Sequence, residues 1–231
     1  MHLAKSSLVT LRCIIGLSAF LCVGCQPSYY RLTMAYIPQK TIPGADANLQ
    51  RFVIAVATFN DQRSTTDRSM IGKRIKSDGS EIKACSQLML PGQAVAAVMR
   101  DFFYRHGYTV YGGMPDWDLD VRSIDSRWGT LVVGGDIEEL SVTCTHDLLT
   151  VQYDTTVRLR VVFADAQRKS ILYSRTLESS ASYKHVRFQQ ERMEQELNAA
   201  LSTAIEKLFE DDKVSRLIDE LTAVRSESIR R

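Results

Sequence analysis

The sequence lacks the local motifs that mark common enzyme sites. It contains no G-x-S-x-G, no H-E-x-x-H, no phosphate-binding loop of the Walker type and, after residue 25, no C-x-x-C pair typical of zinc sites. It also lacks an internal repeat and a low-complexity segment. Since no catalytic arrangement can be assembled from the sequence, we expect a protein that is not an enzyme and that uses no cofactor and no metal.

An excess of charge of one sign is also missing. The chain has 29 lysines and arginines against 27 aspartates and glutamates. Lys5 and Arg12 are the only charged residues among the first 24, so the chain that follows is neutral. Nucleic acid would require a basic stripe, and adhesion to anionic lipid through charge alone would require a polybasic segment. The balance therefore excludes both modes, and no nucleic-acid partner is expected.

The apolar run at the start of the chain is too short to span a bilayer. It extends from Cys13 to Val23, whereas a transmembrane helix needs about 20 apolar residues. Lys5 and Arg12 lie before or at its start, and no acidic residue precedes Asp46. A basic start, a short apolar middle and a small residue before the cleavage point are typical of a secretory signal. We therefore predict a signal peptide over residues 1–24.

The end of this segment predicts the kind of signal. LCVGC, residues 21–25, resembles the bacterial lipobox, in which the cysteine is diacylated on sulfur and becomes the new N-terminus. Cys22 departs from the motif, which usually has leucine there. Two or more acyl chains, at about 0.8 kcal/mol per buried methylene, hold a protein firmly on a membrane. Lipidation at Cys25 is therefore predicted, and an uncleaved anchor helix is the alternative.

The residue after the lipidation site bears on location. Gln26, rather than aspartate, follows Cys25. By resemblance to enterobacterial sorting, this implies a lipid-anchored protein of the outer membrane that faces the periplasm. The inner membrane is the alternative, because sorting rules differ among bacteria.

Two cysteines follow the lipidation site, Cys85 and Cys144. An oxidising periplasm favours a disulfide between them, and the closed loop of about 60 residues would contribute about 4 kcal/mol in the chain-entropy model. Two buried, independent thiols are the alternative. His146 could join both cysteines as a third zinc ligand, but the pattern has no short paired motif, so we expect no zinc here.

A second set of candidate metal ligands is acidic. Asp116, Asp118 and Asp120 alternate as in calcium loops. Such a loop needs glycine at its sixth position and a carboxylate at its twelfth, where this chain has Val121 and Arg127. The segment is therefore expected to be a solvated turn or strand edge.

These patterns divide the chain into four predicted parts. Residues 1–24 are the predicted signal peptide, and residues 25–50, with three prolines and no periodicity, predict a flexible tether. The folded domain is expected over 51–209, and an amphipathic helical tail over 210–231. Within the domain, the polar stretch of residues 60–88 is too long for a plain connection, which indicates a mobile or functional loop.

Hydrophobic periodicity predicts the elements of the domain. Residues 51–59 form a continuous apolar run and predict a strand buried on both faces. Helical spacing begins at Pro91 and stops at Gly107. A short strand is expected over residues 108–112, an antiparallel meander over 128–145, 149–165 and 170–183, and a second helix over 188–209.

Two details refine the meander. Apolar residues alternate from Val157 to Phe163, with Arg158 and Arg160 pointing the other way, so one face of this strand should be wet. Gly134-Gly135 lies in mid-strand, where a bulge or close packing explains it better than phosphate binding. The order strand, helix, strand, meander, helix predicts an α+β fold with a mostly antiparallel sheet and helices packed on one face.

Several stretches resemble known bacterial lipoproteins. FVIAVATFNDQRS (52–64) carries an apolar strand, phenylalanine and Asp-x-Arg, and PGQAVAAVMRDFFYRHGYTV (91–110) is a helix ending in Gly-Tyr-x-Val. Both resemble YajG-like lipoproteins. LVVGGDIEELSV (131–142) and the stretch over 157–182 resemble strands shared with auxiliary lipoproteins of ABC-type lipid transporters.

This resemblance covers most of residues 51–209 and has implications for function. It implies a small lipid-anchored α+β domain that binds an envelope protein partner, as a scaffold component of envelope assembly or transport. The alternative is a periplasmic ligand-binding or peptidoglycan-binding module that uses the polar stretch 60–88.

Overall fold

The computed structural model describes residues 29–40, 52–214, 216–218 and 220–221. The predicted signal peptide and the lipidation site Cys25 lie outside these residues, as do residues 41–50 of the predicted tether and 222–231 of the predicted tail. The fold is α+β, which confirms the predicted class. Within the described ranges, no helix combines the length and apolar character that crossing a membrane requires.

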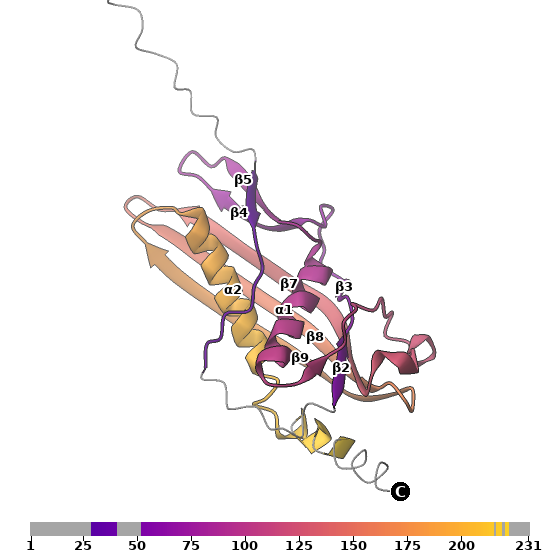
Figure 1. The fold of residues 1–231 in the computed structure, drawn as a ribbon. Helices are drawn as coiled ribbons and strands as arrows, with labels where there is room; N and C mark the ends of the chain where they lie inside the picture. The colour runs from indigo at the N-terminus through magenta and orange to yellow at the C-terminus, as the bar shows by residue number, and fades with distance from the viewer. Residues whose placement is uncertain (1–28, 41–51, 215, 219, 222–231) are drawn as a thin grey trace, which may run out of the picture.

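One sheet of nine strands, in the part of the chain described, carries two long α-helices, and further helical residues follow at 212–214, 216–218 and 220–221 (Figure 1). The strands are β1 (Tyr29–Leu32), β2 (Val53–Val56), β3 (Asn60–Asp61), β4 (Met70–Ile75), β5 (Glu81–Ser86), β6 (Thr109–Val110), β7 (Leu131–His146), β8 (Val151–Asp165) and β9 (Ser170–His185). The long helices are α1 (Pro91–Arg105) and α2 (Gln190–Glu206), and the short 3₁₀ turns are η2 (Val121–Ser123) and η3 (Ser126–Trp128).

The sheet is mixed, so the prediction of a mostly antiparallel sheet is wrong. β7 is parallel to β2, β3 and β4, and β1 is parallel to β5. The pairs β4–β5, β7–β8 and β8–β9 are antiparallel. The apolar pattern identifies which residues face the core, but it does not determine a strand's neighbour or direction, because both kinds of strand alternate with period two.

The polar stretch of residues 60–88 contains three strands rather than one long loop. β3, β4 and β5 all lie within it. The buried guanidinium of Arg63 holds its first part in place: Nε and Nη2 donate to the two carboxylate oxygens of Asp61 at 2.8 and 2.7 Å. Nη1 donates to the carbonyl of Met70 at 2.6 Å, and Nη2 to that of Arg68 at 2.9 Å. The Asp-x-Arg motif therefore joins the strand edge to the following turn.

The main hydrophobic core lies between the sheet and the two helices. α1 contributes apolar side chains including Val95, Met99 and Phe102, and α2 contributes Leu197 and Leu201. Figure 1 shows both helices on the same side of the long strands. Helix α1 begins at Pro91, as the sequence predicts. Val214 and Ile218, from the predicted tail, are also buried in this core.

A smaller core covers part of the opposite face. The indole of Trp117 is fully buried, and its Nε1 donates to the carbonyl of Asp120 at 2.9 Å. This side chain lies over Gly134, where a Cβ would come within 2.7 Å of the ring. At Gly135, a Cβ would lie 1.9 Å from the carbonyl oxygen of Arg160. Close packing therefore accounts for both glycines, while the bulge of β7 lies between Ile137 and Glu139.

The alternation predicted for the central strand of the meander is confirmed. Val157, Leu159, Val161 and Phe163 are all fully buried in the main core. On the other face, Arg158 pairs with Glu178 of β9, and Arg160 pairs with Asp136 of β7. This face is therefore lined by cross-strand ion pairs along the middle of the sheet.

Candidate functional site

The N-terminal strand lies at one edge of the sheet, next to β5. Residues 29–40 are therefore part of the folded domain, and the predicted tether is wrong over this range. β1 pairs with β5 on one side only, so its other backbone edge needs different partners. Helix α2 supplies them.

Five polar side chains of α2, spaced four residues apart, contact the backbone of the N-terminal segment. We call this set the α2 ladder: Gln190, Glu194, Asn198, Ser202 and Glu206. Gln190 donates to the carbonyl of Arg31 at 2.7 Å, and Glu194 accepts from the amide of Thr33 at 2.7 Å. Asn198 accepts from the amide of Ala35 at 3.1 Å and donates to the carbonyl of Thr33 at 3.0 Å. Ser202 accepts from the amide of Ile37 at 2.9 Å, and Glu206 accepts from the amide of Gln39 at 2.7 Å.

The α2 ladder works because two geometric repeats nearly match. Four helical residues rise about 6.0 Å, while two extended residues rise about 6.6 Å. Side chains at every fourth helix position can therefore meet alternate residues of an extended chain that runs beside the helix. Asn198, Ser202 and Glu206 are buried, although all three are polar. The hydroxyl of Tyr36 also donates to Glu206 at 3.0 Å, and burial and this hydrogen bond raise the pKa of Tyr36.

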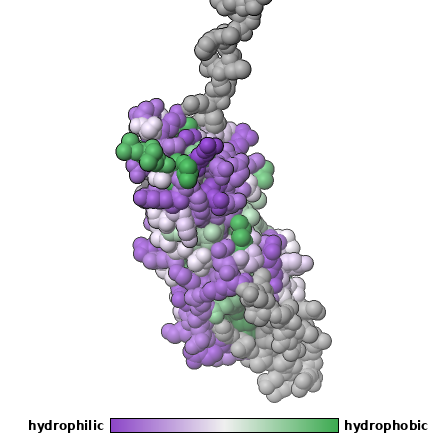
Figure 2. All heavy atoms as spheres, turned by 90° about the vertical axis from the view of Figure 1, so that its left-hand side faces the viewer, coloured by the Kyte–Doolittle hydropathy of each residue, from purple (hydrophilic) through white to green (hydrophobic). Residues whose placement is uncertain are grey.

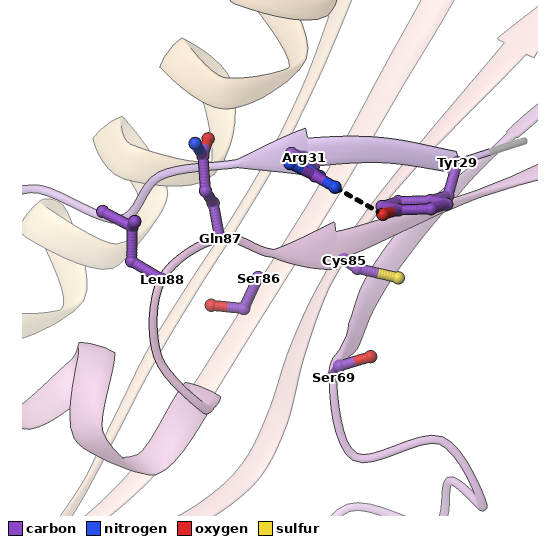
Figure 3. Close-up of a pocket in the computed structure, with 7 residues that line it drawn as sticks. All are labelled: Tyr29, Arg31, Ser69, Cys85, Ser86, Gln87 and Leu88. Carbon is purple, nitrogen blue, oxygen red and sulfur yellow. Dashed lines mark hydrogen bonds between the residues drawn. The ribbon is translucent and has the colours of Figure 1, made fainter. Parts of the chain in front are cut away.

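An open pocket of about 420 Å³ lies beside β1 and the end of β5 (Figure 3). Its lining residues are Tyr29, Arg31, Ser69, Cys85, Ser86, Gln87 and Leu88. The Arg31 guanidinium donates to the Tyr29 hydroxyl at 2.7 Å, and this hydrogen bond raises the pKa of Arg31. The Cys85 thiol and the Ser69 hydroxyl stand below this pair in Figure 3. The pocket thus offers one cation and several neutral polar groups.

The segment after β5 places the apolar side chain of Leu88 at this pocket. Leu88 has φ +71°, which is in the left-handed region, and 85% of the residue is exposed. Met89 and Leu90 are also exposed. Left-handed backbone is unfavourable for a residue with a Cβ, and the usual occupants are glycine and asparagine. We refer to residues 88–90 as the LML segment.

A second open pocket, of about 370 Å³, lies between the residues after β3 and the middle of β7. It is lined by Arg63, Ser64, Thr65, residues 70–73, residues 138–141 and Thr143. Burial raises the pKa of Asp61 nearby, but the hydrogen bonds and charge of Arg63 outweigh it, so this pKa lies below its usual range.

The two cysteines expected to pair are free, so the disulfide prediction is wrong. Cys85 on β5 lies opposite Met70, and Cys144 on β7 lies opposite Arg74, with β4 between them. Two strand spacings amount to about 10 Å, and four residues along a strand to about 13 Å, whereas a disulfide bridges Cα atoms within about 7 Å. Burial raises the pKa of Cys144 to about 11, so its thiol is protonated and unreactive.

The side chains that the sequence analysis considered and rejected as metal ligands have other surroundings in the structure. Among the described residues, no group of three or more His, Cys, Asp or Glu side chains is placed to hold a metal ion. Asp118 and Asp120 instead accept hydrogen bonds from the backbone amides of Asp120 and Arg122, which shapes the turn around Trp117. The interpretation of this segment as a turn accounts for its carboxylates.

His146 lies beside a guanidinium rather than beside another ligand. Arg74 donates to its Nε2 from Nε at 3.0 Å and also reaches it from Nη2 at 2.7 Å. Arginine cannot give up its proton, so His146 accepts at Nε2 and is neutral. Arg74 also donates to the Tyr30 hydroxyl at 2.8 Å, and its guanidinium carbon lies 3.9 Å from the centroid of the Phe188 ring.

We expect the stability of the protein to fall as the pH drops below 6.5. Burial lowers the pKa of His146, and the charge of Arg74 lowers it further. The unfolded state therefore binds the proton first, so stability is fully present above 6.5 and is lost as pH falls through the folded-state value. His146→Gln keeps an acceptor but does not titrate. Urea unfolding at pH 7.5 and 5.5 should show a smaller loss in this variant, and equal losses would contradict the assignment.

Comparisons with known proteins give only distant structural similarity. No family model matches the chain, and no curated protein matches it. A Xanthomonas campestris protein of family-model DUF330 is 10% identical, with TM-score 0.44, over 87% of this chain and 98% of that one. A putative neuraminyllactose-binding hemagglutinin homolog from Helicobacter pylori is 14% identical, with TM-score 0.44, over 84% and 100%. A Neisseria meningitidis lipoprotein is 11% identical, with TM-score 0.38, over 69% and 99%. The resemblance to YajG-like lipoproteins therefore stays a prediction.

Proposed function

We propose that this protein is a bacterial lipoprotein, acylated at Cys25, that works as a non-enzymatic binding module in envelope assembly or transport. The lipobox-like stretch of residues 21–25 supports the anchor. The proposed location is the outer membrane, on the periplasmic side. The partner that fits this proposal is another protein of the envelope.

The LML segment is the observation that carries the binding proposal. Its three apolar side chains stand outside the core, and Leu88 also bears the cost of a left-handed backbone, about 1 kcal/mol or more. Folding alone would favour glycine or asparagine here. Strain combined with exposed apolar surface is typical of contact residues. The adjoining pocket adds Arg31 and Gln87, so the surface suits a protein segment with both apolar and polar groups.

A photo-crosslinking amino acid at position 88, incorporated in living cells, tests this proposal. We expect one discrete crosslinked protein species, because a specific partner presents the same residues to the LML segment each time. A matched control places the same amino acid at Tyr104, which is similarly exposed on α1. The proposal would be contradicted if both positions gave the same set of crosslinked proteins, or if position 88 gave no crosslinked protein.

A folding control separates binding from stability. Leu88→Asn should keep the unfolding midpoint or raise it, because asparagine tolerates left-handed backbone. The same variant should weaken co-purification of the crosslinked partner. Unchanged co-purification would show that the LML segment does not contribute to binding.

The second pocket supports one other function, the binding of a small polar ligand such as a peptidoglycan fragment. Residues 63–65 and 70–73 line it, so it belongs to the polar stretch 60–88. Binding of purified muropeptides that disappears in Ser141→Arg, which fills this pocket, would favour the second function over the first.

A further inference from the structure

Hydrophobic side chains gather at one end of the long strands, outside both cores. Leu148 and Leu149, in the turn between β7 and β8, are 97% and 86% exposed. Val186, which directly follows β9, is 79% exposed. Val151 of β8 pairs with His185 of β9, so Val186 lies next to this turn. Figure 2 shows hydrophobic groups among hydrophilic ones at the corresponding upper end of the molecule. We call these three residues the apolar tip.

The chain enters the sheet at the same end. Tyr29 lies opposite Lys83 of β5, which lies opposite Lys73 of β4, which in turn lies opposite Thr143 of β7. β1 is parallel to β5, β5 is antiparallel to β4, and β4 is parallel to β7, so β7 runs in the direction opposite to β1. The turn that follows β7 at His146 therefore lies at the end of the sheet where the chain enters β1. Figure 1 shows the start of β1 and the β7–β8 turn at the upper end.

The distance from the predicted anchor limits how the domain can stand on a membrane. Cys25 precedes Tyr29 by four residues, which span at most about 14 Å when fully extended. His146, the last residue of β7, lies three residues beyond Thr143, so at about 3.3 Å per residue the strand ends about 10 Å past the level of Tyr29, and the turn that holds Leu148 extends beyond it. With the strands upright, an acylated Cys25 therefore keeps the apolar tip close to the bilayer surface.

Charges around the apolar tip also suit a lipid surface. Lys184 and Arg187 flank Val186, both are exposed, and neither has a carboxylate partner within the described residues. Such side chains can extend to lipid phosphates while neighbouring apolar groups enter the acyl boundary. The acidic residue of the turn, Asp147, accepts from the backbone amide of Leu148 at 2.8 Å and so folds back on the turn itself.

We propose that the apolar tip inserts into the membrane leaflet that holds the acyl chains. The lipid anchor and the tip then form two separate contacts with the bilayer, which fixes the orientation of the domain on the surface. This inference rests on the proposed lipidation of Cys25. It assigns the tip to phospholipid rather than to a protein partner, and it leaves the LML segment available for binding.

Tryptophan fluorescence in vesicles tests the insertion. Leu148→Trp is produced as the full chain with its own leader, purified and reconstituted into vesicles of phosphatidylethanolamine and phosphatidylglycerol with or without brominated acyl chains. Bromine quenches tryptophan only by contact within the bilayer. The wild type supplies the background of Trp117 and Trp128. The matched control is Ile171→Trp, since Ile171 is an exposed apolar residue at the opposite end of β9.

We expect strong quenching and a blue shift of the added fluorescence at position 148, and none at position 171. Added fluorescence at 148 that is not quenched, in protein that carries its acyl mass and floats with vesicles, would overturn the insertion alone. A blue shift without quenching would also overturn it, because a protein surface, such as a second copy of the chain, would then cover the tip. Protein without acyl mass that does not float would overturn the proposed function, and the insertion with it.

Discussion

Replacing Asp61 with asparagine should lower the free energy of unfolding by about 3 kcal/mol. The Arg63 guanidinium is buried, and Asp61 is its only carboxylate partner among the described residues. Asparagine keeps the shape but removes the negative charge, so the variant leaves a buried cation without compensation. Urea denaturation at neutral pH would measure the loss from the shift of the midpoint at constant slope.

The chain supplies a close control for this variant. Asp125 forms the same two-residue carboxylate–guanidinium pair with Arg127, but on the surface. Solvent screens that pair, so Asp125→Asn should move the midpoint little. Similar losses for Asp61→Asn and Asp125→Asn would show that burial of Arg63 is not what makes the Asp-x-Arg motif important.

Replacing Asn198 with alanine should cost about 2 kcal/mol of stability and loosen the N-terminal segment. The variant leaves the amide of Ala35 and the carbonyl of Thr33 without their side-chain partner in a part-buried position. Alanine is the better helix former, so the loss cannot come from the helix itself. Urea denaturation gives the free energy, and hydrogen exchange at the amide of Ala35 shows whether the segment separates from α2.

A substitution on the solvent side of α2 isolates this effect. Gln195 is exposed and does not belong to the α2 ladder, so Gln195→Ala should leave both stability and the exchange rate at Ala35 nearly unchanged. Equal exchange in the two variants would mean that the N-terminal segment is held by β5 and by the core residues Tyr30 and Tyr36 instead.

Elements with strong apolar periodicity could be predicted from the sequence. β2, α1, α2 and the three long strands each lie within or close to the ranges expected, because burial requires a regular apolar pattern. The alternation of Arg158 and Arg160 with buried neighbours identified the polar face of β8 correctly. Pro91 marked the start of α1 for a local steric reason that does not depend on the rest of the fold.

The rest of the fold depends on partners that are distant in sequence. Residues 29–40 resemble a tether because their polar partners, such as Asn198 and Ser202, lie about 165 residues further along. The sequence does contain a pattern that indicates this contact. Polar residues recur at every fourth position from Gln190 to Glu206 beside the apolar stripe, which is more regular than a solvent-exposed helix face requires. The strands within 60–88 are short and polar, and β4 is inserted between β5 and β7, which also separates Cys85 from Cys144.

The candidate site was predictable only in part. The polar stretch 60–88 is expected from its length to be either mobile or functional, and both pockets draw lining residues from it. Leu88 could not be identified, since its left-handed backbone and exposure are set by the passage from β5 into α1. His146 was considered as a zinc ligand, but its partner Arg74 comes from β4, whose position no local pattern reveals.

The attachment of β1 determines how the domain responds to force on its N-terminus. A pull along β1 loads its pairs with β5 and the five side chains of the α2 ladder in shear, so these bonds share the tension. Bonds that are loaded together must break together, whereas a strand pulled sideways would peel off one bond at a time. We therefore expect β1 and the segment that follows it to resist a pull along the strand more strongly than a pull across it.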